Sequence, residues 1–321
     1  MNLKECCVLV TPTSYGKNDP SLKPFLEERV GQVIYNPTSK PLNSAQLKEL
    51  LPGVDGWVAG LDEIDAAALV AADRLKVISR YGVGMDNVDM EAARARSICV
   101  TNTPGANSVS VAELTIAMML ALARHISAAV NATRRGEWPR FSGISLDGKT
   151  VGILGLGAIG RQLALRLAGF GCRLLAYDPF PPEAFASQNK IALLPKDAVL
   201  SQSDFVSLHL PLLPETRGLV DDAFLSRMKR GAYLLNMARG EVVDEVALLR
   251  ALQGGHLAGV ALDAFNQEPP DPANPLLALP QVLVTPHMGA HADSATNSMG
   301  WMSTEDCLAV LEGKTPKYLV P

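Results

Sequence analysis

The chain has 321 residues, of which 48% are apolar, 19% are charged and 5% are aromatic, and its formal net charge is −4. A chain of this length can form two domains that each bury a core. Charges of both signs are spread along it without long blocks of one sign, which argues against nucleic acid or an anionic membrane as its partner.

The apolar segments are too short for a membrane span or an export signal. The longest helix-like apolar stretch, 114–123, is about half of the roughly 20 residues that cross a bilayer. The apolar run near the amino terminus, 6–10, is shorter than the core of a signal peptide. Five scattered cysteines without a CxxC pair predict buried thiols and no metal site. The expected location is the cytoplasm.

Short apolar runs alternate with longer amphipathic segments along the chain, which is typical of parallel βα units. Strands are expected at 6–10, 33–35, 56–59, 77–79, 98–101, 150–154, 173–177, 205–209, 232–236, 259–262 and 282–285. The clearest expected helices are 44–51, 65–71, 110–125, 161–168 and 292–312. A polar stretch, 134–149, separates two series of strands. The pattern predicts an α/β fold of two lobes, each built on a parallel sheet.

A glycine motif follows the expected strand 150–154: Gly155, Gly157 and Gly160 open an apolar helix. Glycines in that context permit a tight turn, close approach of a pyrophosphate and close packing of the helix on the strand. The next strand ends in Asp178, whose carboxylate can bind a ribose diol and would repel a 2′-phosphate. The motif predicts a dinucleotide site that favours NAD over NADP. A turn that serves packing only is the alternative.

Ionisable side chains follow three later strands. Arg239 comes after one strand, Asp263 and Glu268 after the next, and His287 after the last. Ligands bind outside the carboxyl ends of parallel strands, so these side chains are expected at the rim that holds the dinucleotide. The set suits hydride transfer at a 2-keto acid: Arg239 holds the carboxylate, His287 protonates the keto oxygen and Glu268 orients the imidazole. His209 is a weaker candidate for the acid, and each of these residues alone could be an ordinary surface or loop residue.

A glycine-rich loop that begins with Arg80 follows the expected strand 77–79. Its amides and the arginine could hold a carboxylate or a phosphate, and a plain glycine turn with a surface arginine is the alternative.

The motifs together resemble the D-isomer-specific 2-hydroxyacid dehydrogenases. The resemblance runs from about Val8 to Gly313 and rests on the segments 80–89, 155–160, 236–245, 261–270 and 285–287. Within the family the motifs look most like those of the phosphoglycerate dehydrogenases. The family's catalytic residues match Arg239, Glu268 and His287, with His287 as the general acid/base.

The resemblance also implies binding residues, and the sequence shows no group of residues spaced to bind a metal. The positions that line NAD in the family match Gly155, Gly157, Ala158, Ile159, Gly160, Asp178, Leu210, Pro211, Thr216, Met237, Ala238, Asp263 and Gly289. Asp263 is expected to reach the nicotinamide amide. The substrate loops match Arg80, Tyr81, Gly82, Val83, Gly84 and Asn107.

The family arrangement implies an NAD domain, 102–286, inserted in a substrate domain formed by 1–101 and 287–321. It also implies a homodimer formed through the cofactor domain, and the apolar helix at 112–123 suits that use. Because the sequence ends at Pro321, a short form without the regulatory carboxyl-terminal domain of many relatives is expected.

The substrate stays open at this stage. Three residues differ from those usual in phosphoglycerate dehydrogenases: Tyr81, Met237 and His291. These differences allow the substrate to be a different small hydroxy acid, either phosphorylated or derived from a sugar. The alternatives are a glyoxylate or hydroxypyruvate reductase, a sugar-acid dehydrogenase and, in a different class, an NAD(H)-sensing protein similar to the family's corepressors. Formate dehydrogenases pair their histidine with Gln, so Glu268 argues against that activity.

Overall fold

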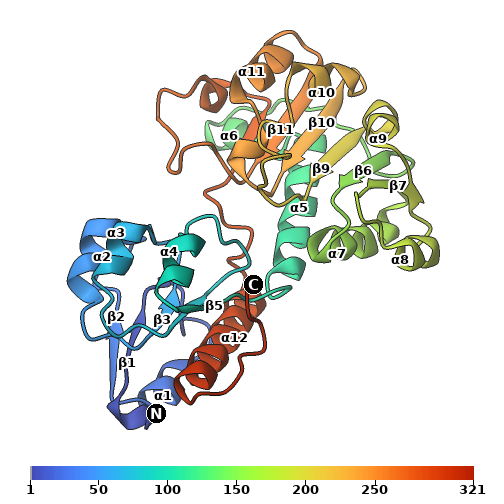
Figure 1. The fold of residues 1–321 in the computed structure, drawn as a ribbon. Coiled ribbons are helices and arrows are strands. Elements are labelled where there is room, and N and C mark those ends of the chain that lie inside the picture. Colours follow the sequence, from blue (N-terminus) through green and yellow to red (C-terminus); the bar gives the residue numbers. More distant parts are fainter. Residues whose placement is uncertain (1) are drawn as a thin grey trace. The chain divides into compact units, whose positions relative to one another are not determined.

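The computed structural model describes residues 2–321, which divide into two compact units. Unit 1 runs to Asn107 and resumes at Ala290–Pro321, and unit 2 is the continuous segment Ser108–Gly289. Each unit contains one parallel sheet with helices on its faces (Figure 1), which confirms the predicted α/β fold of two lobes.

Unit 1 has a five-stranded parallel sheet in the order β2-β1-β3-β4-β5. Its strands are β1 (Cys7–Val10), β2 (Gln32–Tyr35), β3 (Gly56–Ala59), β4 (Val77–Arg80) and β5 (Cys99–Thr101). Its helical segments are η1 (Leu3–Glu5), α1 (Leu22–Glu27), α2 (Ser44–Leu50), α3 (Ala66–Val70), α4 (Met90–Ala95) and α12 (Asp293–Leu311). This strand order is the flavodoxin-like one.

Alternating side chains of the unit 1 strands enter two cores. Leu9 and Trp57 pack with residues of α2, α3 and α4, whereas Val8 and Val58 pack with residues of α1 and α12. Successive strand residues point to opposite faces, so both faces of this sheet are covered.

Unit 2 has a seven-stranded parallel sheet in the order β12-β11-β10-β9-β6-β7-β8. Its strands are β6 (Thr150–Leu154), β7 (Arg173–Tyr177), β8 (Ala192–Leu193), β9 (Phe205–Leu208), β10 (Ala232–Asn236), β11 (Leu257–Leu262) and β12 (Val282–Val284). Chain order reverses between β6 and β9, the point at which doubly wound sheets bind dinucleotides.

Helices cover both faces of the unit 2 sheet. The helical segments of this unit are α5 (Ser108–Ala123), α6 (Ile126–Arg134), α7 (Ala158–Leu167), η2 (Ala168–Phe170), α8 (Glu183–Gln188), α9 (Lys196–Gln202), α10 (Asp222–Arg227), η3 (Gly240–Val242), α11 (Glu245–Gln253) and η4 (Pro275–Ala278). Residues of α5 and α7 pack on one face, and residues of α9, α10 and α11 pack on the other.

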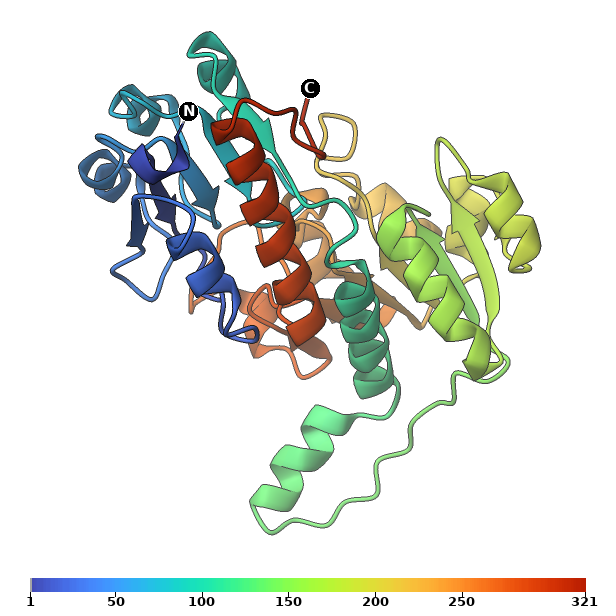
Figure 2. The same cartoon turned by 90° about the horizontal axis from the view of Figure 1, so that it is seen from below.

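The helix predicted over 110–125 ends earlier, at Ala123, because the chain turns there. His125 has a left-handed backbone (φ +53°) and precedes α6, which the sequence did not predict. Figure 2 shows α6 and the extended segment after it projecting from the end of α5, away from the sheet of unit 2. No single helix among residues 2–321 is long and apolar enough to cross a membrane, and α5 with α6 passes that test only as a pair bent by 64°.

The prediction of buried cysteines is correct for Cys6 and Cys307 and wrong for Cys7, Cys99 and Cys172, which are partly exposed. All five thiols are free.

Candidate active site

The glycine turn between β6 and α7 has the geometry that a pyrophosphate requires. A Cβ on Gly155, whose φ is +94°, would lie 2.4 Å from the carbonyl oxygen of His209. A Cβ on Gly160 would lie 2.1 Å from the carbonyl oxygen of Gly155, so both positions exclude side chains. Gly157 faces open space at the start of α7, where N–H groups can meet an anion. These residues fit a dinucleotide.

Asp178, directly after β7, is tied to this turn. Its Oδ2 accepts a hydrogen bond from the N–H of Leu156 at 2.7 Å, and its Oδ1 accepts one from the N–H of Phe180 at 2.8 Å. Each carboxylate oxygen has a second lone pair, so the partly exposed side chain can still accept a ribose hydroxyl.

The other expected cofactor residues of unit 2 lie on loops after β9 and β10 and at the first turn of α7. Ala158 and Pro211 are exposed, Ile159 and Leu210 are partly exposed, and Met237 and Ala238 are buried. The hydroxyl of Thr216 donates to the carbonyl of Pro211 at 2.7 Å and accepts from the N–H of Leu213 at 2.8 Å, which closes the loop after β9.

His287 and Glu268 form a close pair at the carboxyl end of the unit 2 sheet. Nδ1 of His287 lies 2.7 Å from Oε2 of Glu268, whose Oε1 accepts a hydrogen bond from the N–H of Phe265 at 3.0 Å. The two side chains remain 30% and 37% exposed, so solvent and small molecules can reach them. The bond at Nδ1 leaves Nε2 as the ring nitrogen available to a substrate.

Burial acts to raise the pKa of the Glu268 carboxyl, but several contacts outweigh it. The hydrogen bond and charge of His287, the N–H of Phe265 and the charge of Arg239 hold the pKa of Glu268 below its ordinary value. Glu268 is therefore ionised at neutral pH and can accept a hydrogen bond from Nδ1 of His287.

Arg239 follows β10 and lies on the loop beside Phe265. Its Nη1 donates to the carbonyl of Ala238 at 2.9 Å. A Cβ on Gly240 would lie 1.9 Å from the carbonyl carbon of Phe265, so only glycine allows the loops after β10 and β11 to approach this closely. Gly240 was not among the site residues predicted from the sequence. Its position directly after Arg239 could have indicated that the backbone there lies close to a neighbouring loop.

Asp263 is 3% exposed and accepts hydrogen bonds from the segment that carries His287. The donors are Thr285 Oγ1 at 2.6 Å, the N–H of Met288 at 2.9 Å and the N–H of Gly289 at 2.8 Å. Asp263 was expected to reach the nicotinamide amide and Gly289 to line the NAD site, and the contact between them was not predicted.

His209 is poorly suited to the acid role. Its Nε2 lies 2.8 Å from Oγ of Ser207, and its Nδ1 is buried without a hydrogen-bond partner among residues 2–321. Burial lowers the pKa of His209 to about 4, so the ring is neutral at pH 7. His291 is an exposed residue of unit 1.

In unit 1 the guanidinium of Arg80 is almost fully buried, at 3% exposure. Its Nε donates to Oδ1 of Asn87 at 3.1 Å, and its Nη1 donates to the carbonyls of Ala59 and Tyr81 at 3.3 and 3.1 Å. Val83 is exposed at the surface of the same loop. The loop is therefore built around Arg80.

Tyr81, expected from the resemblance among the substrate residues, is 7% exposed and packs in the core of unit 1. Its hydroxyl donates to the carbonyl of Thr296 at 2.8 Å, and burial raises the pKa of this hydroxyl to about 12. Gly82 is buried and has a φ of +154°, whereas Gly84 and Asn107 are partly exposed and keep atoms at the surface of unit 1.

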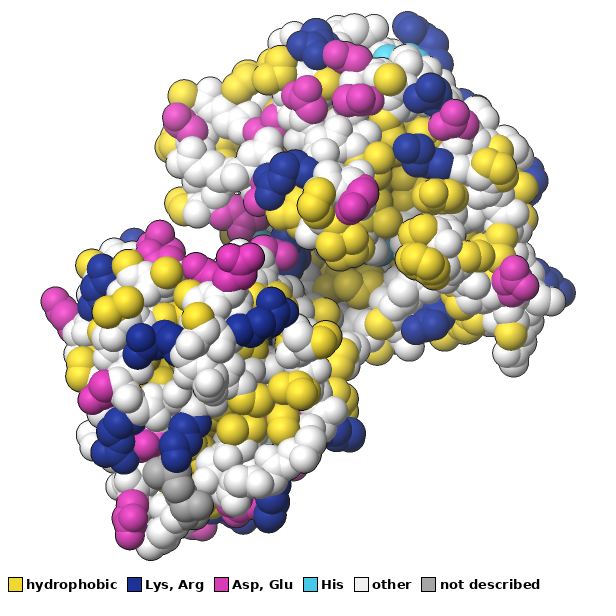
Figure 3. Space-filling view, in the orientation of Figure 1, with side chains coloured by type: hydrophobic (Ala, Val, Ile, Leu, Met, Phe, Trp, Pro, Cys, Tyr) yellow, Lys and Arg dark blue, Asp and Glu magenta, His cyan; other side chains and the backbone are white. Residues whose placement is uncertain are grey.

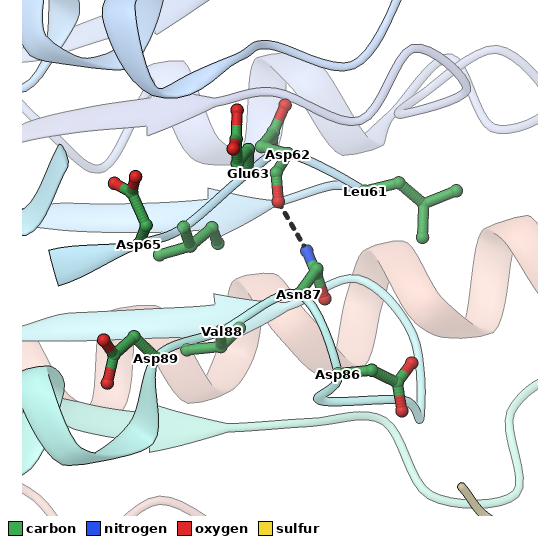
Figure 4. A pocket seen from close by; sticks show the side chains of 9 residues that line it. Leu61, Asp62, Glu63, Asp65, Asp86, Asn87, Val88 and Asp89 are labelled. Atoms are coloured by element: carbon green, nitrogen blue, oxygen red, sulfur yellow. Dashed lines mark hydrogen bonds between the residues drawn. The ribbon is translucent and has the colours of Figure 1, made fainter. Parts of the chain in front are cut away.

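A pocket of about 470 Å³ lies in unit 1 between the segments 61–65 and 86–89. Asn87 joins the two segments by donating a hydrogen bond to the carbonyl of Asp62 at 2.8 Å (Figure 4).

Acidic side chains gather on the edge of unit 1 near α3 and α4, whereas charges of both signs mix elsewhere on the face seen in Figure 3. No group of acidic, histidine or cysteine side chains within 2–321 is arranged to hold a metal ion.

Comparison with known proteins identifies the family. Residues 116–289 match the model of the D-isomer specific 2-hydroxyacid dehydrogenase NAD binding domain, which confirms NAD as the cofactor of unit 2. The D-3-phosphoglycerate dehydrogenase of Methanocaldococcus jannaschii is 40% identical over 297 residues, which are 91% of this chain and 56% of that protein. The chain thus spans about half the length of the curated relatives it matches.

Solved structures agree over the whole chain. The TT0316 protein of Thermus thermophilus superposes with a TM-score of 0.86 at 39% identity, covering 98% of this chain and 100% of that one. The D-lactate dehydrogenase of Aquifex aeolicus, solved with NAD and lactic acid, gives 0.85 at 26% identity, covering 98% of each chain. The resemblance drawn from the motifs is confirmed: the chain belongs to the D-isomer specific 2-hydroxyacid dehydrogenase family.

Proposed function

We propose that this protein is an oxidoreductase that transfers a hydride between NAD(H) and a small 2-hydroxy or 2-keto acid, with phosphoglycerate dehydrogenase activity. The observation that carries the proposal is the pair of His287 and Glu268, 2.7 Å apart, on the sheet edge that also holds the glycine turn. Similarity to D-3-phosphoglycerate dehydrogenases supports the phosphorylated substrate.

The catalytic roles divide among Arg239, Glu268 and His287. The bound nicotinamide supplies the hydride chemistry, and the protein supplies binding and the proton. Arg239 holds the substrate carboxylate through its planar fork of N–H donors. Nε2 of His287 gives its proton to the keto oxygen in reduction and takes it back in oxidation. Glu268 holds Nδ1, which fixes the ring and favours its protonated form.

We further propose that unit 1 is the substrate domain and unit 2 the NAD domain; the units divide after Asn107 and Gly289, a few residues beyond the divisions expected after 101 and 286. Arg80 and the glycine loop after β4 are the proposed substrate residues of unit 1. The buried guanidinium of Arg80, fixed by Asn87, supports a role in anion binding.

NADH oxidation by the purified protein against a panel of 2-keto acids tests this function. The panel contains 3-phosphohydroxypyruvate, hydroxypyruvate, glyoxylate, pyruvate and sugar-derived keto acids. Preference for the phosphorylated acid supports the full proposal. Preference for an unphosphorylated acid retains the reaction and replaces the substrate, and tight NADH binding without turnover favours a sensing protein.

The variant Asp178→Ala is expected to lower the ratio of kcat/KM with NADH to that with NADPH by about tenfold, because it removes a charged hydrogen-bond acceptor and its repulsion of a 2′-phosphate. The ratio is measured with one keto acid. Asp178→Asn is the matched control, since its amide oxygen can still accept from the Leu156 N–H. An unmutated protein that prefers NADPH would contradict the assignment.

We propose that the protein is a cytoplasmic homodimer. Free thiols at all five cysteines fit a reducing compartment. The buried side chains of α5 pack against the core of unit 2, so they are not available for a contact between two subunits. Apolar side chains are exposed beyond it instead: Ile126 at 49%, Val130 at 41%, Trp138 at 76% and Phe141 at 43%.

The variant Trp138→Asp is expected to convert the dimer to a monomer, because a charge replaces a large apolar side chain at the contact surface. Light scattering coupled to size-exclusion chromatography measures the mass. Val246→Asp is the matched control, an apolar residue 61% exposed on α11. A Trp138→Asp protein that keeps the mass of two chains would overturn this surface.

A further inference from the structure

The backbone of His287 has a conformation that residues other than glycine rarely adopt. Its φ is +49°, and its N–H donates to the carbonyl of Thr285 at 3.0 Å, which closes a tight turn around Pro286. A left-handed histidine persists only where the surrounding contacts determine it. The turn that carries the imidazole therefore needs contacts on both of its sides.

Asp263 supplies contacts on both sides of His287. Its Oδ1 accepts from Oγ1 of Thr285 at 2.6 Å, two residues before the histidine, and from the N–H of Met288 at 2.9 Å. Its Oδ2 accepts from the N–H of Gly289 at 2.8 Å, two residues after the histidine. One buried carboxylate thus joins the beginning and the end of the turn.

The far end of the turn has a second anchor. Oγ of Ser110, on α5, donates to the carbonyl of Gly289 at 2.6 Å, and this contact is buried. A Cβ on Gly289 would lie 3.0 Å from Oδ2 of Asp263, so the carboxylate and this backbone are in close contact. Gly289 is therefore held through both its N–H and its carbonyl.

We infer that Asp263, Thr285 and Ser110 form a bracket that positions the imidazole of His287 for proton transfer. The bracket fixes the backbone of His287, while Glu268 fixes its ring at Nδ1. Asp263 thereby acts on the reaction through His287, in addition to the role expected of it at the nicotinamide. The inference rests on the proposed role of His287 as the acid.

The test compares Thr285→Val, which has nearly the same shape and no hydroxyl, with Thr285→Ser, which keeps the hydroxyl. Misplacement of a reacting group by about 1 Å costs up to about a hundredfold in rate, so kcat for keto-acid reduction is expected to fall about tenfold or more in Thr285→Val. Thr285→Ser is expected to stay within about twofold of the unmutated protein. The Kd of NADH, followed by fluorescence, is expected to change little in either variant.

A spectroscopic measurement on the protein without substrate separates positioning from folding. The proton between Nδ1 of His287 and Oε2 of Glu268 is expected to give a downfield resonance, which its loss or shift in Glu268→Gln would assign. We expect Thr285→Val to broaden this signal through faster exchange with water, and Thr285→Ser to retain it. Ser110→Ala removes the second anchor and is expected to broaden the signal in the same way.

An unchanged resonance and an unchanged kcat in Thr285→Val would overturn the bracket, and so would equal losses in Thr285→Val and Thr285→Ser. The resonance is read without turnover, so it tests the bracket even if no keto acid is reduced. Absence of turnover in the unmutated protein would instead refute the proposed function.

Discussion

The substitution His287→Ala is expected to lower kcat for keto-acid reduction by about a thousandfold or more, because it removes the group that protonates the keto oxygen. His209, the weaker candidate for the role, is neutral at pH 7, since burial lowers its pKa to about 4. No neighbouring imidazole is therefore expected to replace the lost acid. Steady-state turnover with saturating NADH and keto acid measures the effect.

The Kd of NADH in His287→Ala is expected to stay close to that of the unmutated protein, since the histidine is not part of the glycine turn. Added imidazole should restore part of the rate, because it can enter the space left by the side chain. His256→Gln is the matched control: His256 contacts the carbonyl of Met228 and is assigned no catalytic role. Near-normal turnover in His287→Ala would remove His287 from the mechanism.

The substitution Glu268→Gln is expected to lower kcat by about a hundredfold, because the neutral amide no longer stabilises a protonated imidazole or fixes its ring. The shape of the side chain is kept, so NADH affinity should change little. A Glu268→Gln protein that keeps the kcat of the unmutated protein would contradict the role of Glu268.

The stability of the native protein also depends on Glu268 in a predictable direction. The contacts with His287, Phe265 and Arg239 hold the pKa of Glu268 below its ordinary value in the folded state. A carboxyl with a lowered pKa contributes stability above its ordinary pKa, and this contribution is lost as the pH falls through the lowered value. Thermal melts across the acid range should therefore differ between Glu268→Gln and the unmutated protein, with the difference vanishing at the lowest pH.

Much of the fold follows from local patterns in the sequence. The strands Thr150–Leu154, Arg173–Tyr177 and Ala232–Asn236 were predicted with the bounds found, because buried parallel strands are nearly continuous apolar runs. The strands predicted to include His209 and Thr285 end one residue earlier, at Leu208 and Val284. The residue at which a strand ends depends on hydrogen bonds with distant segments, and the local sequence gives no information about these bonds.

The helix α6 was missed for a related reason. The sequence continues to look helical through His125, which adopts a left-handed backbone at the bend into α6. The two-residue strand β8, Ala192–Leu193, was also missed, because it is defined only by pairing with β7.

Residue types and strand ends predicted the pair of His287 and Glu268, but not what holds it. Asp263 was expected at the cofactor, whereas its contacts with Thr285, Met288 and Gly289 depend on the path of the turn after β12. Tyr81 was expected at a binding surface, yet its hydroxyl reaches Thr296, which is 215 residues away in the chain. Long-range packing decides such contacts, and one sequence does not reveal it.

Deuterium transfer tests the proposed hydride transfer most directly. The purified protein is incubated with 3-phosphohydroxypyruvate and NADH deuterated at either face of nicotinamide C4, and the product is examined for deuterium at C2 and for its configuration. We expect deuterium at C2 of a D-configured hydroxy acid from one of the two NADH forms, and a much lower rate of formation of this labelled product in His287→Ala. Product of L configuration, or product without deuterium from either form, would contradict the proposed reaction.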